Sequence, residues 1–421
     1  MNNLTYQNRN NQQQLFVEKT PIIDIAQQVG TPFYCYSKKA LVDNFLQFDQ
    51  AFKDNSIANY KICYAIKANC NIHLVKILSD LGSGIDAVSA GEIHHALKAD
   101  INPQKIVFAG VGKTKEEIEY ALKNGVNEFA VESIPEMHLL NKVALDLGKK
   151  AKFLLRVNPD IDAKTHDKIS TGRKSDKFGV DIDLATEIYK EASNLKGLEI
   201  YGISTHIGSQ ITDLEPFKKA FTKIRELCLS LKESGYKISN LDFGGGIAIK
   251  YKDENIFTIN DYVKIIKELT CDLDVQITIA PGRAIMANAG VLVSKVTYIK
   301  ETADKNFAII DAAMNDLARP GLYDAYHQVL PLIHKEGDKK LYDFAGPVCE
   351  TTDILAKKRT LSELKAGDII ALLDSGAYGS SMSNQYNCRP LIPEILVDGD
   401  KLSIIRKRPT FDEMLDLYYT I

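Results

Sequence analysis

Short apolar runs alternate along most of this chain with longer segments in which apolar residues recur every three or four positions. The short runs are typical of buried β-strands, and the longer segments predict helices. This alternation predicts a parallel sheet. Eight strand–helix units in roughly 250 residues match a closed (β/α)8 barrel, so we expect that α/β fold, with an open doubly wound sheet as the alternative. The predicted strands are 62–65, 85–88, 106–109, 128–131, 153–157, 200–205, 238–243 and 275–280.

Three of the intervening segments carry additional helix signals. The sequences at 114–117 and 133–136 read as capping boxes, in which a Ser or Thr is followed three residues later by Glu. Within 214–235, large apolar residues recur at steps of three, four and seven, which predicts one buried stripe on a long helix.

After about residue 288 the pattern changes to short strands separated by Gly, Asp and Pro turns, with little helix. We therefore expect three parts: an N-terminal segment, 1–35, that packs with the β domain; a barrel, 36–288; and a C-terminal domain of β-barrel or β-sandwich type, 289–421. The predicted strands of this last part are 291–297, 307–311, around Thr360, 368–373, 394–397 and 401–406.

Composition narrows the function classes. The 421 residues include 52 basic and 55 acidic side chains, a net charge of −3, which argues against a dominant affinity for nucleic acid or anionic membrane. No apolar run approaches the roughly 18–20 residues of a membrane span, and the polar start is unlike a secretory signal. Seven scattered Cys without a CxxC pair predict free thiols in a reducing compartment and no structural zinc. We expect a cytoplasmic protein without a metal.

Polar or glycine residues follow nearly every predicted barrel strand. In a barrel these carboxyl ends converge on the face where active sites of this fold lie, and a purely structural interpretation does not need so many of them. They are Lys67, Ser89, Gly110, Glu132, Asn158, His206, Gly244, Gly245, Gly246 and Arg283.

Two of these strand ends indicate specific chemistry. Lys67 would point into the barrel mouth as an amine nucleophile for a carbonyl group, although a solvated lysine is the simpler interpretation. The three glycines at 244–246, with Arg283 beside them, would present backbone N–H groups and a guanidinium to an anion such as phosphate. A glycine run also serves tight turns.

His206 could lie flat against a planar ligand on the same rim, or be a hydrogen-bonded structural residue. In the β domain, Cys349 beside Glu350 could be a thiol acid next to a carboxylate, whereas a buried apolar Cys is the commoner case.

Taken together, these segments resemble the pyridoxal-phosphate-dependent decarboxylases of the alanine-racemase-like barrel fold, most closely the diaminopimelate decarboxylases. The resemblance runs from about Leu15 to Tyr418. It is carried by the order and spacing of the segments 30–36, 64–69, 86–92, 206–210, 244–246, 319–323, 346–350 and 376–382.

The resemblance implies roles for individual residues. Lys67 would hold pyridoxal 5'-phosphate as a Schiff base, and His206 would stack on its ring. Cys349 would return a proton to the α-carbon, and Cys349 and Glu350 would reach into the partner subunit's site in a homodimer. The implied cofactor-binding set also includes Asp86, Ser209, Gly244, Gly245, Gly246, Ala280, Gly282, Arg283 and Tyr378, and the implied substrate-binding set is Arg283, Arg319, Tyr323, Glu350 and Tyr378.

The implied reaction converts meso-2,6-diaminopimelate to L-lysine and carbon dioxide, the last step of lysine biosynthesis. Arg319 could pair with the distal carboxylate and Glu350 with the distal ammonium. Ornithine decarboxylases of the family have Asp after the reactive Cys where this chain has Glu350, which favours diaminopimelate.

The chain departs from the family at Ala280, where the family usually has Glu. That carboxylate would pair with the pyridine nitrogen, and a protonated ring is the better electron sink. We therefore expect slower decarboxylation. The alternatives are a related ornithine, lysine or carboxynorspermidine decarboxylase, a racemase, which works with an uncharged pyridine nitrogen, and a non-catalytic pyridoxal-phosphate-binding protein. The roughly 130 residues after residue 288 argue against the last.

Overall fold

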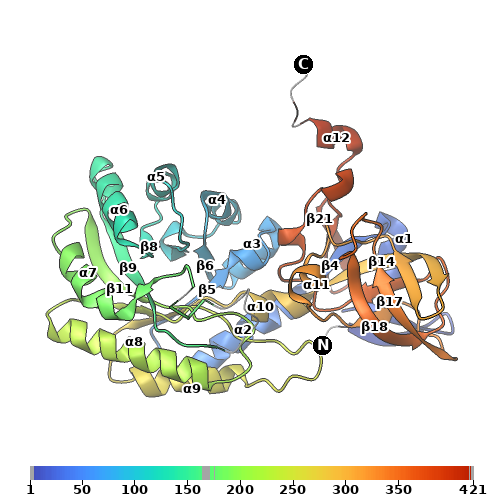
Figure 1. Ribbon diagram of the computed structural model, residues 1–421, viewed down its shortest axis with the longest axis horizontal. Coiled ribbons are helices and arrows are strands. Elements are labelled where there is room, and N and C mark those ends of the chain that lie inside the picture. Colours follow the sequence, from blue (N-terminus) through green and yellow to red (C-terminus); the bar gives the residue numbers. More distant parts are fainter. Residues whose placement is uncertain (1–3, 164–170, 175, 417, 419–421) are drawn as a thin grey trace. The chain divides into compact units, whose positions relative to one another are not determined.

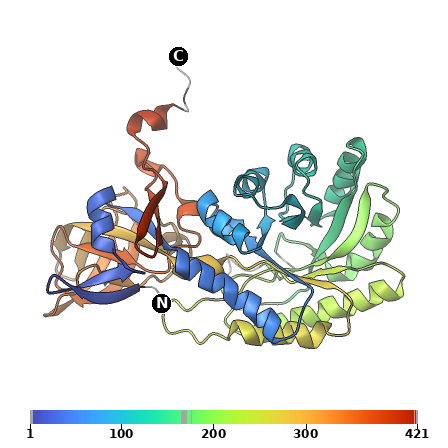
Figure 2. The ribbon, with the colours of Figure 1, turned by 180° about the vertical axis from the view of Figure 1, so that it is seen from behind.

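The computed structural model describes residues 4–163, 171–174, 176–416 and 418 (Figures 1 and 2). The chain divides into two compact units. The barrel unit is Asn44–Lys250 with Asn255–Ala284, and the sheet unit is Met1–Asp43, Tyr251–Glu254 and Ile285–Ile421. The barrel boundaries expected from the sequence lie at 35/36 and 288/289, whereas the two compact units divide at 43/44 and 284/285.

In the described part of the barrel unit, eight parallel strands follow one another in a ring that closes between β8 and β9. Most of their residues are buried, as expected for parallel strands covered on both faces. A ninth strand, β10 (Val180–Asp181), pairs with β9 and was not predicted. The ring consists of β5 (Tyr60–Ala65), β6 (Gly84–Ala87), β7 (Ile106–Phe108), β8 (Glu128–Val131), β9 (Ala151–Asn158), β11 (Leu198–Ser204), β12 (Asn240–Asp242) and β13 (Gln276–Ile279).

Helices lie outside these strands (Figure 1). Each β–α connection carries the chain back to start the next parallel strand, so all eight strands point the same way. The connecting helices are α3 (Ile72–Asp80), α4 (Ala90–Lys98), α5 (Lys115–Lys123), α6 (Ile134–Asp146), α7 (Ala185–Ala192), α8 (Glu215–Glu233) and α9 (Ile259–Thr270), whereas α2 (Lys38–Asp54) precedes β5 and the short α10 (Arg283–Met286) follows β13.

One of the two predicted capping boxes is complete. At α5, Thr114 accepts from the N–H of Glu117, whose carboxylate accepts in return. At α6, Ser133 accepts from the N–H of Glu136. The Glu136 carboxylate, however, binds the N–H of Glu132 and the buried ammonium of Lys113. The second capping box was therefore only half correct: the Ser133 bond forms, but the Glu136 carboxylate binds the buried Lys113 ammonium and the N–H of Glu132 instead of the N–H of Ser133.

The long amphipathic helix was predicted correctly. It is α8, and its buried positions include Phe217, Phe221, Cys228 and Leu231.

The sheet unit is built around β14, which pairs with β4, β15 and β19. Its strand order is β18-β17-β15-β14-β4-β20-β21, with β16 paired to β19. Strands β16 and β17 were not predicted. The bounds are β4 (Phe33–Ser37), β14 (Gly290–Glu301), β15 (Asn306–Ile310), β16 (Val329–Pro331), β17 (Lys339–Ala345), β18 (Ile354–Ser362), β19 (Ile369–Leu372), β20 (Glu394–Asp398) and β21 (Lys401–Arg406); its short helices are α1 (Ile22–Val29), α11 (Arg319–Tyr323) and α12 (Phe411–Leu415).

The polar start of the chain forms a hairpin, β1 (Leu4–Arg9) and β2 (Gln12–Val17), followed by the short β3 (Thr20–Pro21). Asn10 and Asn11 make its two-residue turn, both with positive φ (52° and 59°). Asparagine tolerates this conformation, and such turns match the twist of a hairpin. Sequence periodicity missed this hairpin because the exposed strand β1 has few apolar residues.

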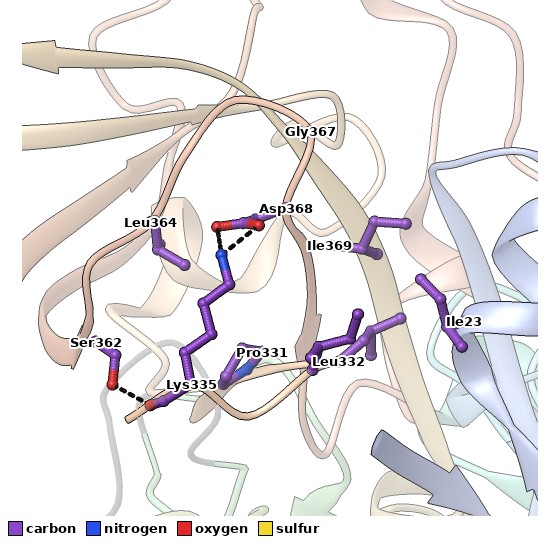
Figure 3. Close-up of a pocket in the computed structure, with 10 residues that line it drawn as sticks. Ile23, Pro331, Leu332, Lys335, Ser362, Leu364, Gly367, Asp368 and Ile369 are labelled. Carbon is purple, nitrogen blue, oxygen red and sulfur yellow. Dashed lines mark hydrogen bonds and ion pairs between the residues drawn. The ribbon is translucent and has the colours of Figure 1, made fainter. Parts of the chain in front are cut away.

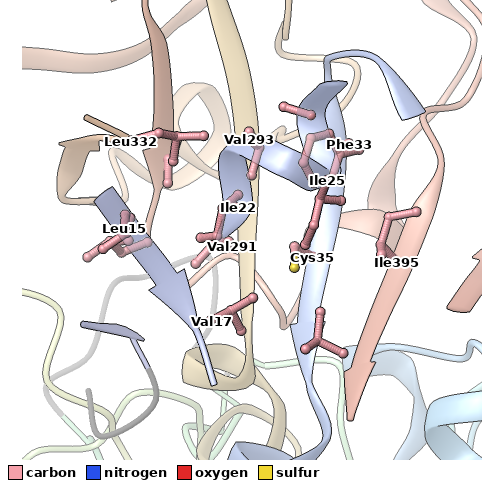
Figure 4. Packing of buried hydrophobic residues seen from close by; sticks show 14 residues of the cluster. Leu15, Val17, Ile22, Ile25, Phe33, Cys35, Val291, Val293, Leu332 and Ile395 are labelled. Atoms are coloured by element: carbon pink, nitrogen blue, oxygen red, sulfur yellow. The ribbon is translucent and has the colours of Figure 1, made fainter. Parts of the chain in front are cut away.

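Residues from both ends of the chain share the core of the sheet unit. Leu15, Ile22 and Phe33 pack with Val293 and Ile395 (Figure 4). This packing holds the N-terminal segment in the same unit as the C-terminal strands.

A small cavity of about 70 Å³ lies in the same unit, lined mainly by apolar groups and by the Lys335–Asp368 ion pair (2.7 Å; Figure 3). None of the candidate site residues lines it. In the described part of the chain, no helix is long and apolar enough to cross a membrane, and no three His, Cys, Asp or Glu side chains are grouped to hold a metal ion.

Candidate active site

Lys67 lies just beyond β5, in a single 3₁₀ turn, Ile66–Ala68, and is half-buried. Asp86 lies on the neighbouring strand β6, where its backbone is paired with Ala65. Desolvation raises the pKa of Asp86, while the charges of Lys67 and Arg156 act in the opposite direction. The amine and this carboxyl group therefore share one electrostatic environment at the carboxyl end of the barrel.

His206 follows β11 on the same rim. The N–H of Gly245 donates to Nδ1 of His206 at 3.3 Å, so the neutral ring carries its proton on Nε2. Desolvation lowers the pKa of His206 well below its usual value, and the charges of Lys67 and Arg156 lower it further. His206 is thus a neutral, oriented ring.

Glycine is required at positions 244–246 because backbone carbonyl groups of neighbouring segments lie where a Cβ would be. A Cβ on Gly245 would lie 2.2 Å from the carbonyl oxygen of Ala280, and one on Gly244, where φ is +63°, would lie 2.6 Å from that of Thr205. Gly246, with φ of +110°, faces the carbonyl of Gly208 in the same way. Only glycine fits this turn without moving the backbone.

Arg283 and Ser209 meet beside this glycine turn. Arg283 is 7% exposed, and one of its terminal nitrogens donates to the Ser209 hydroxyl at 3.1 Å. Gly282, the residue before it, packs against Ala65 and Ala68, so the turn after β13 lies close to the segment that carries Lys67.

Ala280 is fixed by the same turn. Its N–H donates to the carbonyl of Gly244 at 2.7 Å.

Nearby, the buried Asp242 accepts from the N–H of Gly244 (2.9 Å) and from the Ser204 hydroxyl (3.0 Å). Burial, helped by the charge of Asp86, raises the pKa of Asp242 to about 6.

Sequence reasoning missed Arg156, a charged barrel residue that acts on the candidate site. It lies on β9 and pairs with the strand-end residue Glu132 at 2.8 Å, both side chains being less than a tenth exposed. A cation among the otherwise apolar residues of the predicted strand 153–157 was the signal that could have identified it. Desolvation lowers the pKa of His206 and raises that of Asp86; the charge of Arg156 adds to the first effect and opposes the second.

The other predicted strand-end residues have structural partners. Ser89 caps α4, Asn158 donates to the carbonyl of Arg173 (2.7 Å), and the Gly110 carbonyl accepts from Lys113 (2.7 Å). For these three the structural interpretation is sufficient.

The remaining candidates belong to the sheet unit. Arg319 begins α11 and is 5% exposed, and Tyr323 ends that helix half-buried. Tyr378 is half-buried with a positive φ of 55°, in the turn segment that follows β19. Arg319 and Tyr323 thus lie on one short helix, and Tyr378 lies on a separate turn.

Cys349 and Glu350 are both exposed, so the prediction of a buried apolar Cys as the commoner case does not hold here. The N–H of Cys349 donates to the Asn387 side chain (3.1 Å), and the Tyr386 hydroxyl lies 3.3 Å from the Glu350 carboxylate. The buried Asp353 accepts from the N–H of Val348 (2.7 Å) and anchors the turn. The thiol and carboxylate are therefore exposed on a turn that these hydrogen bonds hold in place.

Comparison with known proteins identifies relatives along nearly the whole chain. Residues 38–287 match the family described as pyridoxal-dependent decarboxylase, pyridoxal binding domain. The chain is 47% identical over 406 residues to the diaminopimelate decarboxylase of Vibrio cholerae, an alignment that covers 96% of each chain.

Solved structures agree. The diaminopimelate decarboxylase of Helicobacter pylori complexed with L-lysine superposes with a TM-score of 0.90 at 42% identity, over 94% of this chain and 98% of that chain. The diaminopimelate decarboxylase of M. jannaschii, in co-complex with L-lysine, gives 0.94 at 35% identity, over 100% and 99%. The predicted family and the barrel-plus-sheet fold are confirmed.

Proposed function

The chain belongs to the family of pyridoxal-dependent decarboxylases, and on this premise we propose that it converts meso-diaminopimelate to L-lysine and carbon dioxide. The observation that carries the proposal is the similarity to diaminopimelate decarboxylases over 96% of both chains. The similarity extends beyond the barrel into the sheet unit, where Arg319, Cys349 and Glu350 lie. The reaction would be the last step of lysine biosynthesis.

The barrel residues fit pyridoxal phosphate. The turn at 244–246, where an added Cβ would meet backbone oxygens, and the Arg283–Ser209 pair suit a phosphate group. Lys67 on the same rim is the amine that would anchor the aldehyde. The neutral His206 would lie against the ring without adding a charge to it.

When bound, pyridoxal phosphate would withdraw electrons from the α-carbon of the substrate as carbon dioxide leaves. Asp86 and Arg156 would set the electrostatic potential around Lys67. Ala280 carries no carboxylate for the pyridine nitrogen, so we propose that it limits the rate. Gly282 would let the turn approach the cofactor closely, and we propose that Tyr378 also takes part in cofactor binding.

The sheet-unit residues suit a substrate with an amino-acid group at each end. The guanidinium of Arg319 would bind the distal carboxylate, and Tyr323 on the same helix would add a hydroxyl. Glu350 would bind the distal ammonium. The Cys349 thiol would donate a proton to the α-carbon after carbon dioxide has left.

We further propose a homodimer in which Cys349 and Glu350 complete the site of the partner subunit. Both are exposed on their own chain. The last helix and the residue Tyr418 beyond it support association: Phe411 and Leu415 on α12 are 72% and 62% exposed, Tyr418 is 74% exposed, and α12 stands away from the strands of its own unit (Figures 1 and 2). Grouped exposed apolar side chains mark protein interfaces.

The test is lysine formation from meso-diaminopimelate with added pyridoxal phosphate, with ornithine and lysine as parallel substrates. Lysine formed from diaminopimelate, with no product from the other two, supports the proposal. Faster turnover of ornithine or lysine overturns the substrate assignment. A protein that binds the cofactor yet is inert toward all three, both as given and as Ala280→Glu, overturns the enzymatic assignment.

A further inference from the structure

Arg319 is held by a neighbour that the sequence analysis did not single out. One of its terminal nitrogens lies 3.1 Å from Nε2 of His327, and both side chains are buried, His327 completely. The two residues are eight positions apart, at the start of α11 and just before β16.

The protonation state of His327 follows from its partners. A guanidinium only donates hydrogen bonds, so Nε2 must be the acceptor and carries no proton. The proton is then on Nδ1, which donates to the carbonyl of Leu373 at 2.7 Å. The ring is therefore neutral in this arrangement.

His327 is itself rigidly placed. Arg359 donates twice to its backbone carbonyl, at 2.9 and 3.0 Å. The next residue, Gln328, accepts at its own carbonyl from the N–H of Leu373 (2.9 Å), which ties this segment to the end of β19. The ring of Tyr251 contacts His327 edge to face (5.8 Å between centroids, 82°) and faces the Arg319 guanidinium at 4.8 Å. The Arg359 and Leu373 N–H bonds fix the backbone of this segment, and the imidazole cannot turn away without losing its contacts with the Leu373 carbonyl and Tyr251.

A neutral acceptor differs from a carboxylate in its effect on the guanidinium. A carboxylate at this position would orient Arg319 and would also cancel much of its charge, and a substrate carboxylate would have to compete with it. An imidazole nitrogen orients the guanidinium and leaves its positive charge intact. The aromatic face of Tyr251 likewise stabilises the cation without neutralising it.

We propose that His327 is a positioning residue for Arg319: its neutral ring fixes the guanidinium while preserving the charge that selects ligands carrying a distal carboxylate. The inference rests on the proposed function, in which Arg319 binds that carboxylate.

The contribution of Arg319 to carboxylate recognition can be isolated by comparing two competitive inhibitors. L-lysine and cadaverine share both amino groups and the carbon chain, and differ by the carboxylate that Arg319 would bind. The ratio of their inhibition constants, measured on the holoenzyme with meso-diaminopimelate as substrate, therefore reports carboxylate recognition. A general loss of folded enzyme or of turnover leaves this ratio unchanged.

The decisive variants are His327→Gln and His327→Glu, which differ by one charge at nearly the same size. We expect His327→Gln to keep the preference for lysine within about threefold of the native value, because its amide oxygen replaces Nε2. His327→Glu should lower that preference at least about tenfold and raise the KM for diaminopimelate more than it lowers kcat. His334→Glu, at an exposed position of the same unit, is the control for added charge.

Equal lysine preferences in the Gln and Glu variants, or an equal loss in His334→Glu, would overturn the proposal. Should one of the pair fail to fold, His327→Asn, which removes the acceptor at this distance without adding charge, takes its place. His327→Asn must show a lysine preference weaker than that of the native enzyme. Failure of the proposed function is seen separately, in the native enzyme, as no lysine formed from diaminopimelate.

Discussion

At the scale of single residues, position 280 is where a small change should alter the chemistry most. Its N–H is bound to Gly244, so a longer side chain there starts from a fixed backbone. We expect Ala280→Glu to raise kcat by roughly 10–100-fold, since a hydrogen bond to a charged group contributes about 1.5–3 kcal/mol. Ala280→Gln, of the same size but uncharged, is the control. Equal steady-state rates for the three proteins would contradict this prediction.

Asp242 should make the stability of the barrel depend on pH. Its pKa in the fold is about 6, above the ordinary 3.8, because the carboxyl is buried and faces the charge of Asp86. The stability contribution of the protonated form is therefore complete below about pH 4 and is lost as the pH rises through 6. Relative to Asp242→Asn, the native free energy of unfolding should fall by about 2–3 kcal/mol between pH 4 and 7.

Urea unfolding of the cofactor-free proteins at pH 4, 5, 6 and 7 measures this difference. Asp272→Asn is the matched control, because the Arg225 side chain lowers the pKa of Asp272 to about 2 and its titration lies below this range. A constant difference between native protein and Asp242→Asn would show that the carboxyl does not titrate there.

Residue types at strand ends predicted which side chains the barrel gathers on one rim, but they did not identify the buried partners of those side chains. Lys67, His206 and the glycines at 244–246 carry their chemistry in their type and position, and the barrel does gather them on one rim. Arg156 differed from its neighbours only as a cation within an apolar run, and His327 gave no signal at all. Their roles depend on which side chains face them in the folded unit, and neither strand periodicity nor residue spacing contains that information.

At the scale of elements, the glycine turn after β12 should not tolerate a side chain. A Cβ at Gly245 would lie 2.2 Å from the Ala280 carbonyl, so the backbone would have to move, and with it the N–H that binds His206. We expect Gly245→Ala to weaken pyridoxal-phosphate binding at least about tenfold, as measured by absorbance titration. Gly112→Ala, on an exposed loop where a Cβ meets nothing within 4 Å, should bind as the native protein does. Equal affinities would contradict the prediction.

The elements themselves were predicted best where burial determines the pattern. All eight barrel strands and α8 were found because fully buried strands and one-sided helices leave clear apolar periods. The hairpin at Asn10 and Asn11 was not, because its turn chemistry is local and β1 is largely exposed. The half-formed capping box at Ser133 shows another limit of prediction from sequence: an ion pair formed in the folded unit, Lys113 with Glu136, replaces a local hydrogen bond.

At the scale of the whole molecule, the change of period near residue 288 indicated a second unit. The sequence pattern did not show, however, that one short segment within the barrel sequence belongs to that second unit. Tyr251–Glu254 belongs to the sheet unit although barrel sequence flanks it on both sides. Apolar periodicity reports that a residue is buried and does not report which core buries it. This segment matters because Tyr251 supports Arg319 within the sheet unit.

The proposed exchange of residues between subunits makes a prediction about mixed dimers. Lys67→Ala removes the cofactor anchor, and Cys349→Ala removes the proton donor, so each variant alone should be nearly inactive. If Cys349 acts in the partner's site, each mixed dimer has one site with both native residues and one with neither. Random pairing makes half of the dimers mixed, so the equimolar mixture should regain about 25% of native activity.

The two purified variants are mixed under conditions that allow subunit exchange, and lysine formation is followed until it is constant. If Cys349 instead served the site of its own chain, every site in a mixed dimer would still lack one residue, and exchange would restore nothing. Exchange itself is verified by a tag on one variant, so that a lack of recovery with mixed dimers present would contradict the shared site. The exposure of Cys349 and Glu350 on their own chain is the feature of the fold that makes recovery the expected result.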